Sequence, residues 1–157
     1  MWPALREPHG DCYGLAVGEE GGGPTRRMGR VLVIDNELSI AEMLREALGD
    51  EFDVTVTSDP VAALGWLLAG DWYDVVLCDV MMPTMNGVEL RERVHGVRPD
   101  IAARIVFVTG GVVSEHLRRE MDELPNMVLP KPFDLGSLRE MLRRRTSTRP
   151  PPPRAGR

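Results

Sequence analysis

The chain has 157 residues, of which 43% are hydrophobic and 27% are charged, and its formal net charge at pH 7 is −5. These values are ordinary for a globular domain with a sizeable core, and the acidic balance argues against a general nucleic-acid binder. No apolar run reaches the roughly 18 residues of a membrane span, and no secretory signal opens the sequence, so we expect no membrane contact. A reducing cytoplasm is the simplest location, because Cys78 lies in a predicted core strand and the only other cysteine is Cys12.

Both ends of the sequence lack the periodicity of helices and strands. Residues 1–28 are rich in glycine, proline and charge, and residues 146–157 are rich in proline and arginine, with four consecutive prolines at 150–153. Such segments bury too little apolar surface to offset their ordering entropy, so we expect two disordered tails. We also expect residues 1–27 to be dispensable for folding, with Met28 as a candidate translation start. One domain is then expected, at residues 29–145.

Strand and helix signals alternate along this domain. Apolar or alternating runs predict five strands, at residues 30–34, 53–57, 74–79, 104–108 and 127–129. Helical spacing of apolar residues predicts helices at 38–48, 61–69, 87–97, 115–124 and 135–145. Asp59, Ser114 and Asp134 are predicted to cap three of these helices. Five strand–helix units with short connections predict an α/β fold, a doubly wound five-stranded parallel sheet of flavodoxin-like strand order 2-1-3-4-5 with helices on both faces.

Polar residues stand where four of the predicted strands end. Asp35 and Asn36 follow the first strand, and Asp79 closes the third. Thr109 follows the fourth strand and Lys131 follows the fifth. Parallel strands bring their carboxyl ends to one edge of the sheet, where ligands bind. That edge is therefore predicted to hold a carboxylate pair, a hydroxyl and an ammonium, a set that suits a divalent metal and a phosphoryl group.

Several motifs together resemble the receiver domain of two-component response regulators. They are VLVIDNE at residues 31–37, DVMMPTMNG at 79–87, TG at 109–110 and KPF at 131–133. Each motif falls at the expected strand end and in the expected order, and the match covers residues 29–145. The stretch from Thr109 to Leu135 is also similar to receivers attached to hybrid sensor kinases.

The resemblance implies a phosphoacceptor in a phosphorelay rather than an enzyme in its own right. Asp79 is expected to take a phosphoryl group from a phosphohistidine of a histidine kinase or hybrid kinase, and to assist its own phosphorylation and dephosphorylation. Mg2+ is the implied cofactor, because a carboxylate attacking an anionic group depends on charge neutralisation. The downstream partner is expected to be an unidentified protein, and the receiver is expected to stand alone, without an output domain. The expected metal ligands are Asp35, Asn36, Asp79 and the Met81 backbone carbonyl, and the expected phosphoryl contacts are Thr109 and Lys131.

Two residues depart from the family pattern. Asn36 stands where the family usually has a second acid, so metal affinity should fall. Val128 stands where the family often has an aromatic residue that changes rotamer on phosphorylation, so Thr109 and its following loop would have to carry that change. Both departures favour an alternative function, a receiver-like interaction module that works without phosphorylation.

Two further expectations concern the motif loops. Met81, Met82 and Met85 are expected to pack the loop after the third strand against the core. The position of Met81 also disfavours an aspartate-based phosphohydrolase, because such enzymes need an acid two residues after the nucleophile. The sequence leaves open whether the bond between Lys131 and Pro132 is cis or trans.

Overall fold

The computed structural model describes residues 27–147, in which five strands alternate with six helices. The strands are β1 (Arg30–Ile34), β2 (Asp53–Thr57), β3 (Val75–Asp79), β4 (Ile105–Thr109) and β5 (Val128–Pro130). The helices are α1 (Leu38–Leu48), α2 (Pro60–Ala69), α3 (Gly87–His95), α4 (Pro99–Ala102), α5 (Glu115–Glu123) and α6 (Leu135–Ser147). Most of both expected tails lies outside the described residues.

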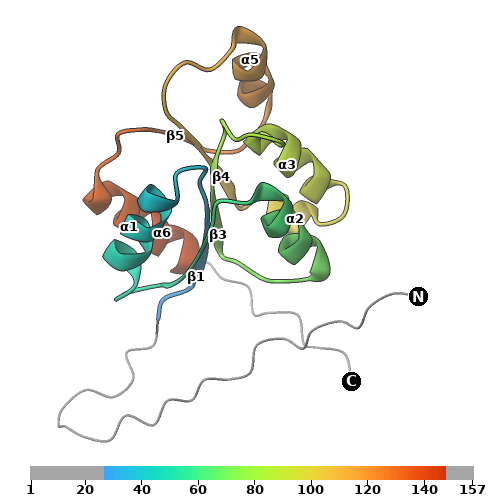
Figure 1. Ribbon diagram of the computed structural model, residues 1–157. Coiled ribbons are helices and arrows are strands. Elements are labelled where there is room, and N and C mark those ends of the chain that lie inside the picture. The colour runs from blue at the N-terminus through green and yellow to red at the C-terminus, as the bar shows by residue number, and fades with distance from the viewer. Residues whose placement is uncertain (1–26, 148–157) are drawn as a thin grey trace, which may run out of the picture.

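The five strands form one parallel sheet in the order β2-β1-β3-β4-β5, which confirms the predicted doubly wound topology (Figure 1). The register places Ile34 opposite Cys78 and Asp79 opposite Val108. The residues that follow β1 and β4 therefore lie beside Asp79 at the carboxyl edge of the sheet. Sheet topology alone thus brings the predicted site residues to one place.

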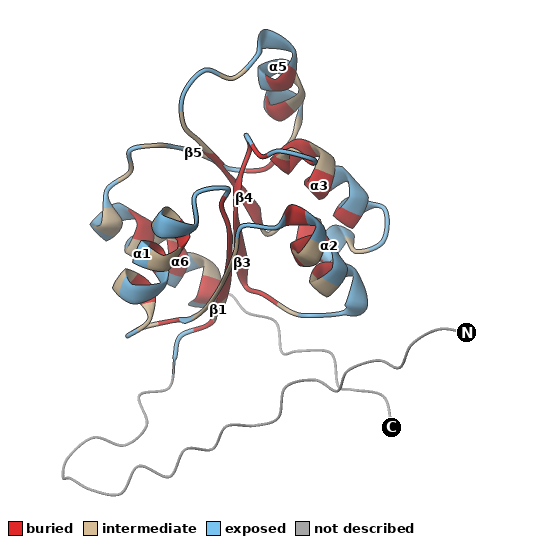
Figure 2. Cartoon of the chain, in the orientation of Figure 1, coloured by how far each residue is buried: buried red, intermediate tan, exposed pale blue. Residues whose placement is uncertain are grey.

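Helices cover both faces of the sheet, as the sequence predicts. α1 and α6 lie on one face, and α2, α3, α4 and α5 lie on the other (Figure 1). Side chains alternate along a strand, so successive residues of β1 pack into the hydrophobic cores on opposite faces of the sheet. Val31 and Val33 pack on the side of α1 and α6, and Leu32 and Ile34 pack on the side of the other helices. All of β3 is buried between the two layers (Figure 2).

The three predicted helix caps are present. A backbone N–H donates to the Asp59 carboxylate at 2.9 Å, to the Ser114 hydroxyl at 3.2 Å and to the Asp134 carboxylate at 2.8 Å. Each side chain thereby satisfies a donor that the first turn of its helix leaves free. No helix within residues 27–147 is long and apolar enough to cross a membrane.

Helix α4 was not predicted, and the C-terminal ends of α3 and α6 each differ from expectation by two residues. α4 has only four residues, too few to show a period, and it forms because Ile101 and Ala102 are fully buried against the sheet. α3 ends at His95 rather than at residue 97. α6 runs to Ser147 because Thr146 in its last turn is buried. Helix α6 therefore extends two residues past its expected end at residue 145.

The last turn of α6 packs against the segment that leads into β1. A Cβ atom on Gly29 would lie 2.6 Å from Thr146 Cγ2, so only glycine allows this approach. Before β1, the Met28 N–H donates to the Glu51 carbonyl at 2.7 Å, next to the end of α1. The two ends of the described chain thus lie side by side, at the end of the sheet opposite Asp79.

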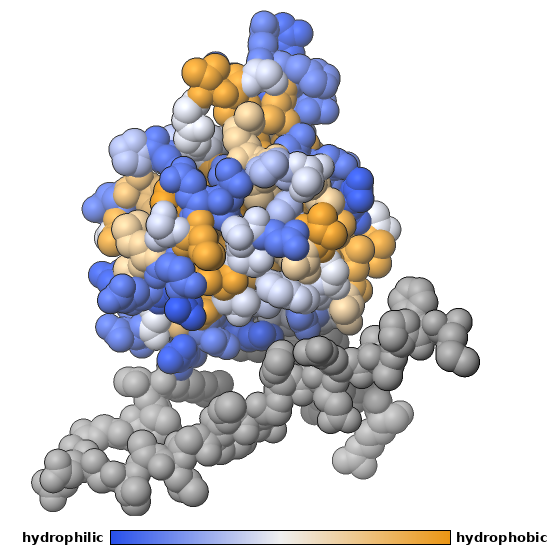
Figure 3. Space-filling view, viewed as in Figure 1, coloured by the Kyte–Doolittle hydropathy of each residue, from blue (hydrophilic) through white to orange (hydrophobic). Residues whose placement is uncertain are grey.

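Helix α5 stands apart from the other helices (Figure 1). Only Leu117 and Met121 of its nine residues are buried. Its outer end is hydrophilic in the space-filling view (Figure 3). α5 is therefore joined to the core along a narrow apolar strip.

Candidate functional site

Asp35, Asp79 and Lys131 meet at the carboxyl edge of the sheet. Lys131 Nζ lies 2.7 Å from Asp35 Oδ2 and 3.9 Å from Asp79 Oδ2. The two carboxylate residues are nearly buried, with 3% of Asp35 and 7% of Asp79 exposed. A single ammonium thus partly neutralises two carboxylates that are nearly excluded from water. The site keeps a net negative charge, which attracts a further cation.

The backbone around the site holds the two carboxylates in place. The Met81 N–H donates to Asp79 Oδ1 at 3.2 Å, and the Asn36 N–H also donates to this carboxylate. The Glu37 N–H donates to Asp35 Oδ1 at 2.8 Å. Burial raises the pKa of Asp79, the Lys131 charge opposes that rise and the Asp35 charge adds to it.

The loop between β3 and α3 approaches Asp79 closely, and Gly87 makes this possible. A Cβ atom on Gly87 would lie 2.7 Å from the Asp79 carbonyl oxygen. Met82 and Met85 are buried, as expected, but Met81 is 44% exposed, so the expectation that all three pack on the core is wrong for Met81. The Met81 backbone faces the Asp79 carboxylate at the rim of the sheet, and its side chain consequently faces solvent.

The remaining predicted site residues lie on the loops around this centre. Asn36 is exposed in the loop between β1 and α1. Thr109 ends β4, one residue beyond the register partner of Asp79, and its carbonyl accepts the Lys131 N–H at 2.6 Å. The bond between Lys131 and Pro132 is cis. The functional roles assigned to Asp79, Thr109 and Lys131 remain predictions.

The oxygen-rich donor set fits Mg2+ better than a softer metal. Asp35 and Asp79 offer carboxylate oxygens at one place, and Mg2+ needs only one or two carboxylates because it keeps several waters. No cluster of three histidine, cysteine, aspartate or glutamate residues suited to a metal occurs within residues 27–147. Asn36 accounts for the missing third acid, since its amide can offer an oxygen without a full charge.

An apolar pocket of ≈ 360 Å³, which no sequence pattern predicts, adjoins Lys131. Gly110 lies against the lysine stem, where an added Cβ would be 3.1 Å from Lys131 Cδ. Half of Met43 is exposed at the pocket wall. The signal that could have indicated this pocket is Met43, an apolar residue between Glu42 and Arg45 on the polar side of α1. Its lining residues are Ile40, Met43, Gly110, Gly111, Lys131, Pro132 and Phe133.

Known proteins share this sequence pattern. The family described as the response regulator receiver domain matches residues 31–143. The DNA-binding transcriptional regulator NtrC of Rhizobium meliloti is 35% identical over 114 residues, which cover 69% of this chain and 22% of that protein. The response regulator MprA of Mycobacterium tuberculosis is 34% identical over 120 residues, 73% of this chain and 51% of that protein. The chain thus spans about half or less of the length of these curated relatives.

Solved structures share the fold. Chemotaxis protein CheY4 of Vibrio cholerae has a TM-score of 0.63 and 28% identity, over 74% of this chain and 98% of that one. The signal receiver domain of a histidine kinase from Syntrophus aciditrophicus has a TM-score of 0.69 and 20% identity, over 82% of this chain and 98% of that one. With the matched motifs at the carboxyl edge of a five-stranded parallel sheet, the chain belongs to the response regulator receiver domain family.

Proposed function

We propose that this receiver takes a phosphoryl group from a phosphohistidine of a histidine kinase or hybrid kinase onto Asp79, in the presence of Mg2+. The main observation in support is that Lys131 Nζ lies 2.7 Å from Asp35 Oδ2 and 3.9 Å from Asp79 Oδ2. This arrangement provides a nucleophilic carboxylate, a fixed positive charge and an oxygen ligand for a metal within one small site. The proposal places the protein in the cytoplasm, with a protein rather than nucleic acid as its downstream target.

The chemistry is a transfer between two protein side chains. A carboxylate oxygen of Asp79 forms a bond to phosphorus while the bond from phosphorus to the histidine nitrogen breaks, and the nitrogen keeps that electron pair. The Met81 and Asn36 N–H groups orient the Asp79 carboxylate for this attack. Lys131 and the Thr109 hydroxyl are assigned to the phosphoryl oxygens. Mg2+, held by Asp35, Asn36, Asp79 and the Met81 carbonyl, would supply the rest of the charge neutralisation.

The direct test is phosphorylation of Asp79 by a small donor. Wild-type protein incubated with acetyl phosphate and Mg2+ should gain one phosphoryl mass in intact-protein mass spectrometry, and Asp79→Asn should gain none while keeping its melting temperature. Asp59→Asn, which removes a surface carboxylate at a helix cap, is the matched control and should be phosphorylated normally. Addition of the same mass to Asp79→Asn would refute the assignment.

The metal assignment predicts that Asn36→Asp tightens Mg2+ binding. A charged ligand in place of a neutral amide should strengthen binding by about 1–3 kcal/mol, a factor of roughly five to 150, which isothermal titration calorimetry can measure. Ser39→Asp adds the same charge on the exposed side of α1 and should change the affinity much less. Equal affinities for wild type and Asn36→Asp would mean that residue 36 does not bind the metal.

A phosphorylation-independent interaction module is the second candidate. It is favoured by Asn36, and by Val128, which is 41% exposed on β5 in place of an aromatic switch residue. The two functions differ in one measurable respect: an interaction module would keep its partner affinity in Asp79→Asn and without a phosphodonor. A phosphorylation switch would change that affinity at least severalfold on phosphorylation.

A further inference from the structure

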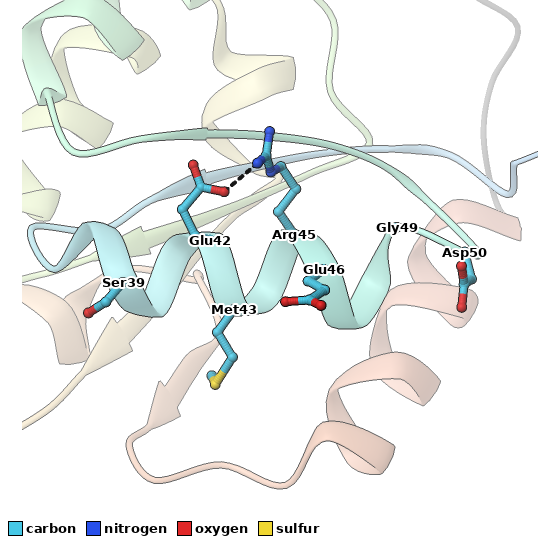
Figure 4. Close-up of a pocket in the computed structure, with 7 residues that line it drawn as sticks. All are labelled: Ser39, Glu42, Met43, Arg45, Glu46, Gly49 and Asp50. Atoms are coloured by element: carbon cyan, nitrogen blue, oxygen red, sulfur yellow. Dashed lines mark ion pairs between the residues drawn. The ribbon is translucent and has the colours of Figure 1, made fainter.

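The exposed side of α1 carries an acidic groove of ≈ 590 Å³ (Figure 4). Glu42, Glu46 and Asp50 recur every four residues, which places them in one stripe along this side. Arg45 pairs with Glu42 at 2.6 Å and is the only cation of residues 27–147 in an ion pair with the stripe. The groove therefore keeps a net negative charge. Its lining residues are Ser39, Glu42, Met43, Arg45, Glu46, Gly49 and Asp50.

Helix α6 delivers the C-terminal segment next to this groove. Arg139 Nη2 donates to the Ala47 carbonyl at 2.6 Å, beside the end of α1. One turn later, Arg143 makes two hydrogen bonds to the carboxylate of Glu51, at 2.7 and 2.8 Å. Glu51 directly follows Asp50, the last acid of the stripe, and α6 ends at Ser147, one turn beyond Arg143. The chain thus leaves the described domain beside the acidic groove.

The segment that follows has the opposite charge. Residues 148–157 read TRPPPPRAGR, with three arginines and no acid. We propose that this segment binds along the acidic groove of α1, with Arg149 and Arg154 opposite its carboxylates.

The dimensions of the two partners agree. An extended polyproline conformation would separate Arg149 from Arg154 by about 15 Å. Glu42 and Asp50 are eight residues apart, in α1 and the turn that follows its C-cap Gly49, and a helical rise over that stretch would be about 12 Å. Consecutive prolines also lower the entropy lost on binding, because their backbone is already restricted.

Because the segment is part of the same chain, the bound state is populated even though each contact is weak. Exposed ion pairs are individually weak, but a short linker holds its two partners at an effective concentration in the millimolar range. The contact is consequently partial at physiological ionic strength and weakens as salt screens it. Met43 lines both the groove and the pocket beside Lys131, so a segment bound in the groove lies next to that pocket. The inference concerns binding alone and does not require phosphorylation.

Paramagnetic relaxation enhancement in the full-length chain tests the proposal. A nitroxide is attached to Ala155→Cys in a Cys12→Ser background, in which Cys78 stays unlabelled because it is fully buried. Amides of residues 39–50 should be broadened at low salt, and at least twofold less in 0.5 M NaCl. Combining Glu42→Gln, Glu46→Gln and Asp50→Asn should remove most of the broadening.

The matched control removes the same charge from a different helix. Glu115→Gln, Asp122→Asn and Glu123→Gln neutralise three exposed acids of α5 and should leave the broadening of α1 unchanged. The proposal is overturned if the label broadens α1 and α5 equally, since that pattern indicates an unbound segment. It is also overturned if neutralising α1 has no more effect than neutralising α5, because the net charge rather than the groove would then be responsible.

Discussion

The helices α5 and α6 both follow strands that end at the site, yet the domain holds them in different ways. α6 is fixed along its length by the fully buried Leu138 and Leu142 and by the contacts of Arg139 and Arg143 with Ala47 and Glu51. α5 buries only Leu117 and Met121. The loop that leads into α5 also contains Gly110 and Gly111, and the latter has a positive φ of 77°.

A buried polar network holds Asn126, three residues after the end of α5. The Asn126 amide donates to the carbonyls of Ala102 and Ile105, each at 2.8 Å. Its oxygen accepts from Arg91 Nε at 3.0 Å, and Arg91 is only 6% exposed. Beyond its narrow apolar strip, α5 is thus anchored by one buried point in the segment that follows it, whereas α6 is held by contacts along its length.

The looser packing of α5 predicts that a structural change at Asp79 displaces α5 more easily than α6. Elements with few buried apolar contacts open at lower free energy than the rest of a domain. A rearrangement at Thr109 would therefore move α5 more readily than a rearrangement at Lys131 would move α6. The next three predictions test this asymmetry, beginning with the largest effect.

Truncation of the α6 core should destabilise the domain more than truncation of α5. Leu142→Ala removes a fully buried side chain and should lower the free energy of unfolding by about 2–5 kcal/mol, because the cavity cannot collapse in a packed seam. Leu117→Ala, at the 7% exposed contact of α5, should lower it by about half as much or less. Urea denaturation of both variants provides the measurement. Equal losses would show that α5 is packed as tightly as α6.

Removal of the polar network should release α5 selectively. Asn126→Ala leaves two buried carbonyls and a buried guanidinium without this partner, and should lower the free energy of unfolding by about 1–3 kcal/mol. Amide hydrogen exchange should speed up in α5 more than in α6. Ser58→Ala removes a hydroxyl from an exposed turn and serves as the control. It should change neither the free energy of unfolding nor the exchange rates of α5 and α6. Uniform acceleration across both helices would contradict a local role for Asn126.

The smallest effect on stability is expected from the exposed ion pair between Arg143 of α6 and Glu51, and this effect depends on pH. The Arg143 hydrogen bond lowers the pKa of Glu51 below its ordinary value of 4.5. A carboxyl group with a lowered folded-state pKa stabilises the fold above its unfolded pKa and loses that contribution as pH falls through the folded-state value. Glu51→Gln should therefore be less stable than wild type at pH 7.

The difference in stability between wild type and Glu51→Gln should become smaller as the pH falls below about 4.5, the ordinary pKa of this carboxyl group. Thermal melts of both proteins at pH 7 and pH 3 measure it. Glu37→Gln, in the loop before α1, provides the comparison. A gap of constant size at both pH values would mean that Glu51 does not stabilise α6 through its charge.

Much of the fold followed from local patterns in the sequence. The bounds of β1 and β2, the caps at Asp59, Ser114 and Asp134, and the strand order agree with the structure. Period and capping act within a few residues, and short connections leave few topologies for strand–helix units. The same rules placed Asp35, Asp79 and Lys131 at one edge, because parallel strands share the direction of their carboxyl ends.

Contacts between distant residues decided the rest. Lys131 and Asp35 lie 96 residues apart and form an ion pair that no local pattern specifies. α4 forms because Ile101 and Ala102 are buried by other elements, and α6 continues past Arg145 because Thr146 meets Gly29. Met81 faces solvent because its backbone faces the Asp79 carboxylate across the edge of the sheet. The sequence by itself determined the elements, their order and the residues at the site edge; only the tertiary structure decided which charges pair there, because that depends on packing across the whole domain.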